Sequence, residues 1–175
     1  SIGMDAVTYT VWGSDGLPFL TAPPAGALAE ARSLLNALGA LDGTRITDHG
    51  RALARLPLHP RLGHMLVAGG KPAAGLAALL SERDILQGAP TDLLLRIKAL
   101  AGERGSYPIR QGTLARVKQE AKRLAKLAPV RLEQTNETYA AMAYPDRIAM
   151  RRSGDDPRYI LSGGKGAVMD AADAL

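Results

Sequence analysis

Apolar residues recur at intervals of three and four through most of this chain, and proline and glycine separate the resulting runs. Such spacing is typical of helices that bury one face. The pattern predicts helices over residues 4–13, 24–38, 48–56, 60–67, 72–86, 90–102, 113–129 and 137–144. We therefore expect a mainly α fold, although the Val, Thr and Tyr residues of the first run also suit a strand.

The period of the pattern shortens between the second and third predicted helices. Leu41 and Ile46 flank an Asp-Gly dipeptide that favours a tight reversal, so a very short β-hairpin is expected there. Gly39 before the hairpin suits a left-handed helix C-cap, and Thr47 after it suits an N-cap. Two helices, a hairpin and two more helices indicate a winged-helix arrangement.

Proline and glycine punctuation and a late change of pattern divide the chain into three predicted domains. Residues 1–68 form the winged-helix domain with its N-terminal helix, and residues 69–145 form a helical bundle. From residue 146 the pattern alternates, with strands predicted near 148–151, 159–161 and 167–169. Three short strands do not make a stable sheet by themselves. Residues 146–175 are therefore interpreted as the start of a truncated β-rich C-terminal domain.

The predicted helix at 113–129 has the clearest two-sided pattern in the chain. Its expected inward face consists of Leu114, Val117, Ala121, Leu124 and Ala128. Its other face is basic, with Glu120 opposing five cations: Arg116, Lys118, Lys122, Arg123 and Lys126. The three lysines are spaced by four residues and so lie in one row. We take the five cations as candidate nucleic-acid-binding residues.

The composition makes a polyanion a possible partner, and it excludes disulfide or thiolate chemistry and a membrane-spanning segment. The 175 residues are 46% hydrophobic, which is enough for a core, and carry a net charge of +5 that favours nucleic-acid contact. The absence of cysteine excludes disulfides and thiolate chemistry, and it suits the reducing cytoplasm, which is the expected location. No apolar run approaches the roughly 18 residues of a membrane span, so no membrane partner is expected.

No motif in the sequence supports catalysis or binds a cofactor or metal. Residues 162–166 read SGGKG, but a P-loop needs Ser or Thr after its lysine and a helix to follow, so a hairpin turn is expected. His59 and His64 are five apart, whereas two ligands on one helical turn want a spacing of three or four. We expect His59 in a turn and His64 as a partly buried helix residue. No catalytic, cofactor-binding or metal-ligating residues are predicted.

Two interpretations of the basic face stay open at this point. Most charged helix faces are solvated surfaces, yet five cations against one anion is more lopsided than solubility requires. Contact with a phosphate backbone is the equal alternative. Because only 4% of the residues are aromatic, few bases could stack on the protein. Binding through this face would tolerate many sequences and weaken as salt rises.

Several motifs, taken in order, resemble one protein family. Residues 17–66 contain a Pro-Pro, a helix ending in LGAL, a small wing, T-x-x-G and PL-x-PRL, which is similar to the segment after the motor domains of DEAH-box RNA helicases. His59 within LPLHPRLGHML, ALLSERD at 78–84 and AYPDRIAMRR at 143–152 resemble the bacterial HrpB branch.

The resemblance implies a division of labour within a longer protein. Such helicases have two RecA-like motor domains that hold ATP and Mg²⁺, a winged helix that packs against them, a ratchet-like helical domain along the single-stranded RNA channel, and a β-rich domain. This chain contains none of the ATP-binding motifs. It is thus expected to be a non-catalytic accessory region whose partners are RNA and its parent's motor domains. ATP, Mg²⁺ and ATP hydrolysis are expected only of the full-length parent, and the basic helix is our hypothesis for the RNA-lining surface.

A free-standing winged-helix DNA-binding regulator with a helical dimerisation domain is the alternative from another class. It would need base-reading side chains on an exposed helix, whereas the predicted wing is very short and the candidate helices are mostly apolar. Sequence-specific DNA binding would favour the regulator. Stable association with a separately made motor fragment would favour the helicase accessory region.

Overall fold

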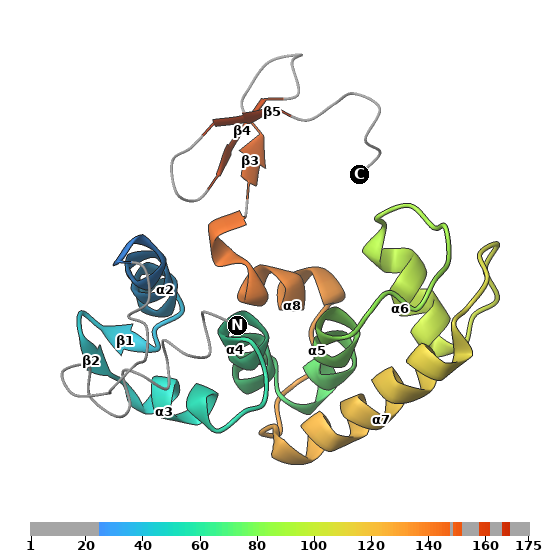
Figure 1. Cartoon of the computed structure of the whole chain (residues 1–175), viewed down its shortest axis with the longest axis horizontal. Coiled ribbons are helices and arrows are strands. Elements are labelled where there is room, and N and C mark those ends of the chain that lie inside the picture. Colours follow the sequence, from blue (N-terminus) through green and yellow to red (C-terminus); the bar gives the residue numbers. More distant parts are fainter. Residues whose placement is uncertain (1–24, 148, 152–157, 162–165, 169–175) are drawn as a thin grey trace.

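The computed structural model describes residues 25–147, 149–151, 158–161 and 166–168, and its side-chain environments cover residues 26–146 (Figure 1). Helices dominate these residues, which confirms the predicted mainly α class. The helix predicted at 4–13 lies outside the described residues. No described helix is both long and apolar enough to cross a membrane.

The first part of the described chain is a winged helix. Helix α2 (Ala25–Ala37) leads to strands β1 (Leu41–Asp42) and β2 (Arg45–Ile46), which pair antiparallel and confirm the predicted hairpin. Helices α3 (Asp48–Ala54) and α4 (Pro60–Gly69) follow. The turns before and within the hairpin have positive φ at Gly39 (67°) and Gly43 (62°), a conformation that glycine adopts without steric penalty. Five buried residues form a small core here: Ala31, Leu35, Ala40, Leu41 and Leu53.

The T-x-x-G motif fastens α3 to the hairpin. The Thr47 hydroxyl accepts a hydrogen bond from the Gly50 amide at 3.0 Å, as an N-cap should, and donates to the Gly39 carbonyl at 2.7 Å. Gly50 is buried, and a Cβ there would lie 2.2 Å from the Ala40 carbonyl oxygen. The motif therefore needs a hydroxyl at Thr47 for hydrogen bonding. It needs glycine at residue 50 because a side chain there would clash with the Ala40 carbonyl.

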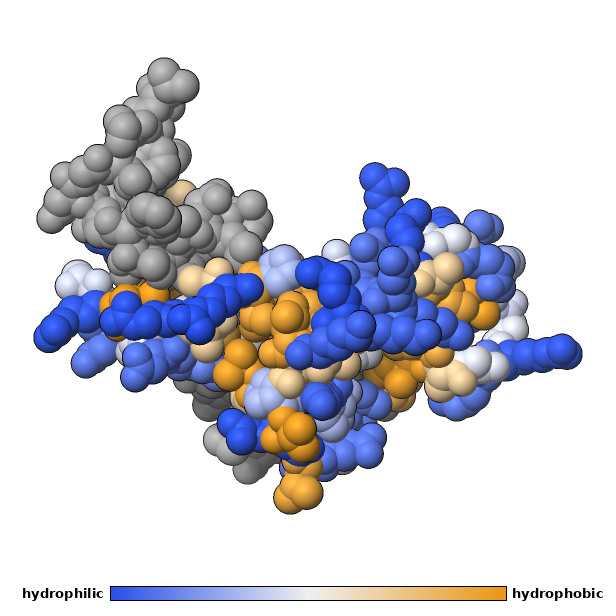
Figure 2. All heavy atoms as spheres, turned by 90° about the horizontal axis from the view of Figure 1, so that it is seen from below, coloured by the Kyte–Doolittle hydropathy of each residue, from blue (hydrophilic) through white to orange (hydrophobic). Residues whose placement is uncertain are grey.

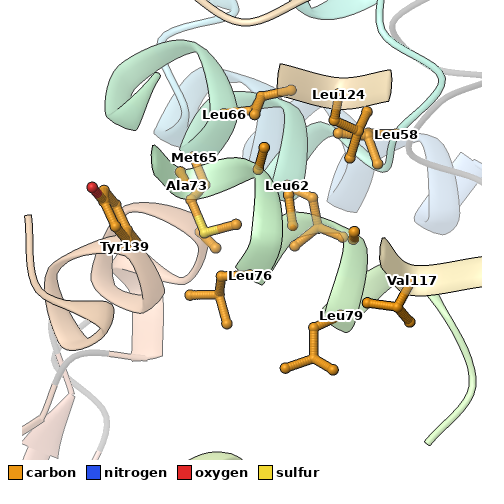
Figure 3. Close-up of a cluster of buried hydrophobic side chains, with 14 of the residues drawn as sticks. Leu58, Leu62, Met65, Leu66, Ala73, Leu76, Leu79, Val117, Leu124 and Tyr139 are labelled. Atoms are coloured by element: carbon orange, nitrogen blue, oxygen red, sulfur yellow. The ribbon is translucent and has the colours of Figure 1, made fainter. Parts of the chain in front are cut away.

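The second part is a helical bundle built around a larger core. A 3-10 turn, η1 (Lys71–Ala73), leads into α5 (Ala74–Ser81), followed by α6 (Leu93–Ala101), α7 (Gln111–Leu127) and α8 (Asn136–Ala143). In this core α7 packs along α5, and α8 packs on α4 (Figure 1). In Figure 3 side chains from α4, α5, α7 and α8 converge, including Met65 and Val117, both fully buried.

Helix α4 contributes to both cores, because its Leu62, Met65 and Leu66 belong to the larger cluster while Val67 packs against both. The predicted domain limits at residues 68 and 145 stay a prediction. Beyond α8, the turn η2 (Pro145–Arg147) precedes β3 (Ala149–Arg151), β4 (Arg158–Leu161) and β5 (Gly166–Val168). These strands form an antiparallel sheet in the order β3-β4-β5, where three strands were predicted.

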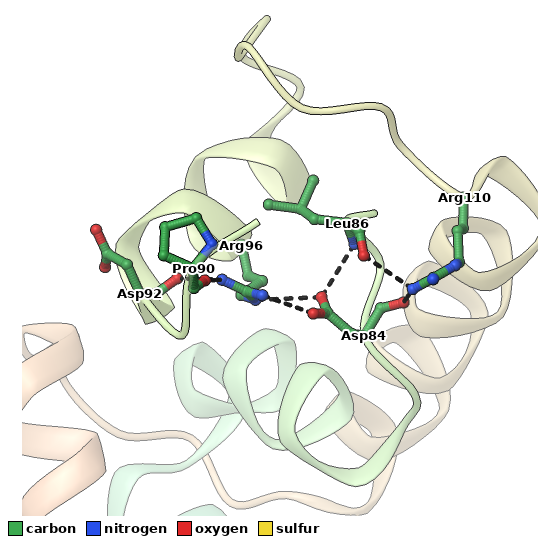
Figure 4. Close-up of polar contacts among 6 residues, drawn as sticks. All are labelled: Asp84, Leu86, Pro90, Asp92, Arg96 and Arg110. Atoms are coloured by element: carbon green, nitrogen blue, oxygen red, sulfur yellow. Dashed lines mark hydrogen bonds and ion pairs between the residues drawn. The ribbon is translucent and has the colours of Figure 1, made fainter. Parts of the chain in front are cut away.

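The helix predicted over 72–86 ends earlier, at Ser81, because the next backbone groups bond elsewhere. Arg96 donates to both carboxylate oxygens of Asp84, at 3.1 and 2.6 Å, and the Leu86 amide donates to the same carboxylate (Figure 4). These bonds, the Arg96 pair foremost, hold the pKa of Asp84 below its usual value. Arg110 donates to the carbonyls of Asp84 and Leu86 at 3.0 and 2.8 Å. Ile85, expected on the helix, is fully buried in the segment that follows it.

Two local features complete the bundle after α5. The segment between α6 and α7 is exposed but held at one point, because Ile109 pairs with Leu86 in an isolated β-bridge and Tyr107 packs against the core. On α6, Ala99 is buried, whereas Leu94 is 50% exposed.

We expect Gly50→Ala to lower the free energy of unfolding by about 1–3 kcal/mol, since the new methyl must displace the Ala40 carbonyl or shift α3. Urea unfolding followed by circular dichroism measures the change. Gly26→Ala is the matched control, because nothing lies within 4 Å of a Cβ on that helical glycine. Equal stability of the two variants would contradict the close approach at Gly50.

Candidate nucleic-acid interface

Helix α7 presents the predicted basic face to solvent. Its inward face is confirmed, with Val117 and Leu124 fully buried against the bundle. The five candidate residues all lie on its exposed side, as the pattern predicted: Arg116, Lys118, Lys122, Arg123 and Lys126. The seating of α7 on α5 therefore fixes the direction in which the cations point.

Two of the five cations are paired with carboxylates. Arg123 donates to both oxygens of Glu120, at 2.8 and 2.5 Å, which holds the pKa of Glu120 below its usual value. Arg116 lies 3.8 Å from Glu82, and its guanidinium also reaches the Thr113 hydroxyl at 3.3 Å. Sequence reasoning included Glu120 but missed Glu82, which comes from the end of α5. These two arginines therefore contribute less positive field than the lysines.

The three lysines form the least compensated part of the face. Within the described part of the chain, Lys118, Lys122 and Lys126 have no hydrogen bond or ion pair, and all three are exposed. Four residues of helix rise separate each from the next, which is about 6 Å along the axis. A row of unpaired ammonium groups of this kind attracts phosphates without regard to base identity.

The tertiary structure adds two cations that sequence reasoning missed. The Lys71 amide donates to the Pro129 carbonyl at 2.9 Å, which places Lys71 just beyond the C-terminal end of α7. The side-chain stem of Arg131 lies over Gly70, next to Lys71. Both are exposed, so two further cations lie close to the end of α7, beyond Lys126. Lys71 is far from α7 in the sequence, so its position near the end of that helix could not be predicted from residue spacing. Figure 2 looks onto the side where α7 lies and shows hydrophilic regions around a band of hydrophobic residues.

The histidines make structural contacts. His59 is the N-cap of α4 and accepts a hydrogen bond from the Arg61 amide at 3.3 Å. His49 Nε2 and His64 Nδ1 lie 2.8 Å apart, with the two rings edge to face, so α3 is bonded to α4. Among the described residues no group of three or more His, Asp or Glu side chains could hold a metal ion. The His49–His64 contact was not predicted, because the two residues are 15 positions apart and only the fold brings them together.

Arg61 connects two of the motifs that carry the family resemblance. It lies in PL-x-PRL, on α4, and its guanidinium forms a two-point ion pair with Asp146 of AYPDRIAMRR, with one contact at 2.9 Å. It also donates to the Ala143 carbonyl at 3.3 Å and lies 5.2 Å from the ring centre of Tyr144. Its side chain is only 14% exposed. The motifs are therefore two halves of one contact between α4 and the segment that leads to β3.

Comparison with known proteins gives the same assignment from three directions. Residues 31–58 match the helicase associated domain (HA2), winged-helix. The chain is 34% identical over 164 residues to the ATP-dependent RNA helicase HrpB of Escherichia coli (strain K12), an alignment that covers 91% of this chain and 19% of the helicase. A crystal structure of the E. coli DExH-box NTPase HrpB superposes with a TM-score of 0.71 and 33% identity over 99% of this chain and 21% of that one. A crystal structure of E. coli DEAH/RHA helicase HrpB gives 0.68 and 31%, with 99% and 22% covered.

The winged helix and the helical bundle behind it thus define a helicase-associated region. Its sequence and fold are those of the accessory region of an HrpB-type DEAH helicase, which confirms the resemblance seen in the motifs. The chain spans about a fifth of the length of these relatives.

We expect Arg61→Lys to lower the free energy of unfolding by about 1–2 kcal/mol, because an ammonium cannot reproduce the two-point bond to Asp146. Urea unfolding is the measurement. Arg55→Lys is the matched control, since Arg55 is exposed and has no ion pair among the described residues. A loss for Arg61→Lys no larger than that of the control would show that the ion pair contributes nothing.

A second prediction concerns pH. Burial lowers the pKa of His49 and His64, and the neighbouring His49 lowers that of His64 further, so the folded protein favours the neutral pair. The unfolded chain, with histidine pKa values of about 6.5, binds these protons more readily. The neutral pair therefore contributes fully to the free energy of unfolding above about pH 6.5. This contribution is lost as the pH falls through the pKa values of the two histidines in the folded protein.

His64→Gln removes one titrating group and its repulsion with the other. We expect its stability to fall less steeply than that of the wild type when urea unfolding is repeated from about pH 7.5 to about pH 5. His59 and the carboxylates titrate in both proteins, so the difference isolates the pair. Parallel pH profiles would refute the assignment.

Proposed function

We propose that this chain is the non-catalytic accessory part of an ATP-dependent RNA helicase, which supports the motor domains and contacts single-stranded RNA through α7. The observation that carries the RNA contact is the row of Lys118, Lys122 and Lys126, exposed and without ion pairs among the described residues. The family relationship supports the helicase context, since E. coli HrpB is named an ATP-dependent RNA helicase.

ATP and Mg²⁺ have no part in the chemistry proposed for this chain itself. The sequence lacks a P-loop, and the described residues offer no cluster of ligands for a metal ion. In this proposal the motor domains bind and hydrolyse ATP, and the accessory part is inactive alone. The cytoplasm is the proposed location, because the chain has no cysteine and tolerates a reducing compartment.

The chemistry of α7 favours phosphate contact over base recognition. Its exposed face carries cations but no aromatic side chain on which a base could stack. Contacts of this type position a strand without reading it. We therefore propose that the strand is held mainly by its backbone and that many sequences are accepted.

Titration of a fluorescent single-stranded RNA at several salt concentrations tests the proposal. We expect Lys118→Gln with Lys122→Gln to weaken binding at low salt, because two phosphate contacts are lost. The slope of log affinity against log salt should decrease by about 1.4, at about 0.7 for each contact to a single strand.

Arg45→Gln with Arg55→Gln is the matched control, since both residues are exposed in the winged helix and the same charge is removed. Identical slopes for the wild type and the lysine variant would contradict the α7 assignment. Loss of sequence-specific DNA binding in the control would instead favour a free-standing winged-helix regulator, which the comparisons do not favour.

A further inference from the structure

Aliphatic side chains are exposed at the end of α7 and in the segment that connects it to α8. The proposed contact of the lysine row with RNA does not explain their exposure. Leu127 is 51% exposed, Val130 75% and Leu132 85%. Among the described residues only one other large hydrophobic side chain, Leu94 at 50%, is exposed. Scattered single residues of this kind are ordinary, but three within six positions form a patch.

This segment is held in place at both ends. The Pro129 carbonyl accepts from the Lys71 amide at 2.9 Å, and the Gln134 amide donates to the hydroxyl of the buried Tyr139 at 2.7 Å. Between these points the stem of Arg131 lies over Gly70, while its neighbours Val130 and Leu132 are exposed. The backbone is extended at both flanks of this segment, at Ala128 and at Thr135, and no helix or turn lies between them. Both aliphatic side chains are exposed to solvent on this extended segment.

The backbone of the same segment is also open. Within the described part of the chain, the amides of residues 130–133 donate no hydrogen bond. An extended segment with free N–H groups and aliphatic side chains has the properties of an unpaired strand edge. It resembles the surfaces to which an extended peptide adds by main-chain pairing.

We infer that residues 127–133 are a docking site for an extended, aliphatic segment of the motor portion of the same helicase polypeptide. The inference rests on the proposed function. About four-fifths of each relative's chain lies outside the region matched here, so most of the helicase is available to cover the patch. RNA fits it poorly, since aliphatic side chains offer no stacking surface and free N–H groups in a row match a strand.

The site also adjoins the basic row, because Leu127 follows Lys126 directly and Arg131 lies beside Lys71. A motor segment bound here would sit next to the RNA that α7 holds. The accessory part would then be attached to the motor at the point where it contacts the strand.

Hydrogen–deuterium exchange on the full-length helicase polypeptide and on this chain alone tests the inference. We expect the amides of residues 130–133 to exchange at least about tenfold more slowly in the full-length protein. Val130→Asp with Leu132→Asp should remove that protection, whereas Leu94→Asp, at an exposed position on α6, should leave it intact. Because the substituted side chains are exposed, both variants should fold, and protection of the amides of α5 verifies this.

Equal exchange in the two proteins would overturn the inference. Protection of the chain alone that grows with its concentration would also overturn it, in favour of a second copy of the chain. Lys118→Gln with Lys122→Gln in the full-length protein separates this site from the RNA surface. If RNA affinity is unchanged while residues 130–133 stay protected, the RNA contact fails and the docking site stands.

Discussion

The packing of α4 between two cores is the constraint on which the rest of this structure depends. One side of the helix meets α3 and the smaller core, and the other meets α5 and α8. Met65 and Leu66 are fully buried in the larger core, so that core cannot form without α4 in place. Val67 extends the same helix to the smaller core, so α4 is the element that joins the winged helix to the bundle.

The same principle gives α7 its direction. Burial of Val117 and Leu124 leaves the helix only one orientation on α5, and that orientation turns the lysine row outward. The charged surface is therefore a consequence of apolar packing on the opposite face. A partner would meet a helix that is already in place, so only the lysine side chains would have to be ordered on binding.

The helices and the hairpin could be predicted from the sequence, because helix caps and the spacing of apolar residues depend only on residues close together in the chain. Thr47, Gly39 and the stripe on α7 are of this kind. Contacts between residues that are far apart in the sequence could not be predicted in this way. The early end of α5 depends on Arg96 and Arg110, the compensation of Arg116 depends on Glu82, and the position of Lys71 near the end of α7 depends on the fold. The motifs identified Arg61 and Asp146 as family features without showing that they touch.

The contact between Arg61 and Asp146 has a consequence for how the chain enters β3. The two residues are 85 positions apart, and α5, α6, α7 and α8 lie between them. Closing so long a loop costs entropy, and the packing of α8 on α4 offsets it by holding the two residues close together. The ion pair therefore depends on the assembled bundle, and the attachment of the segment that enters β3 depends on the ion pair in turn.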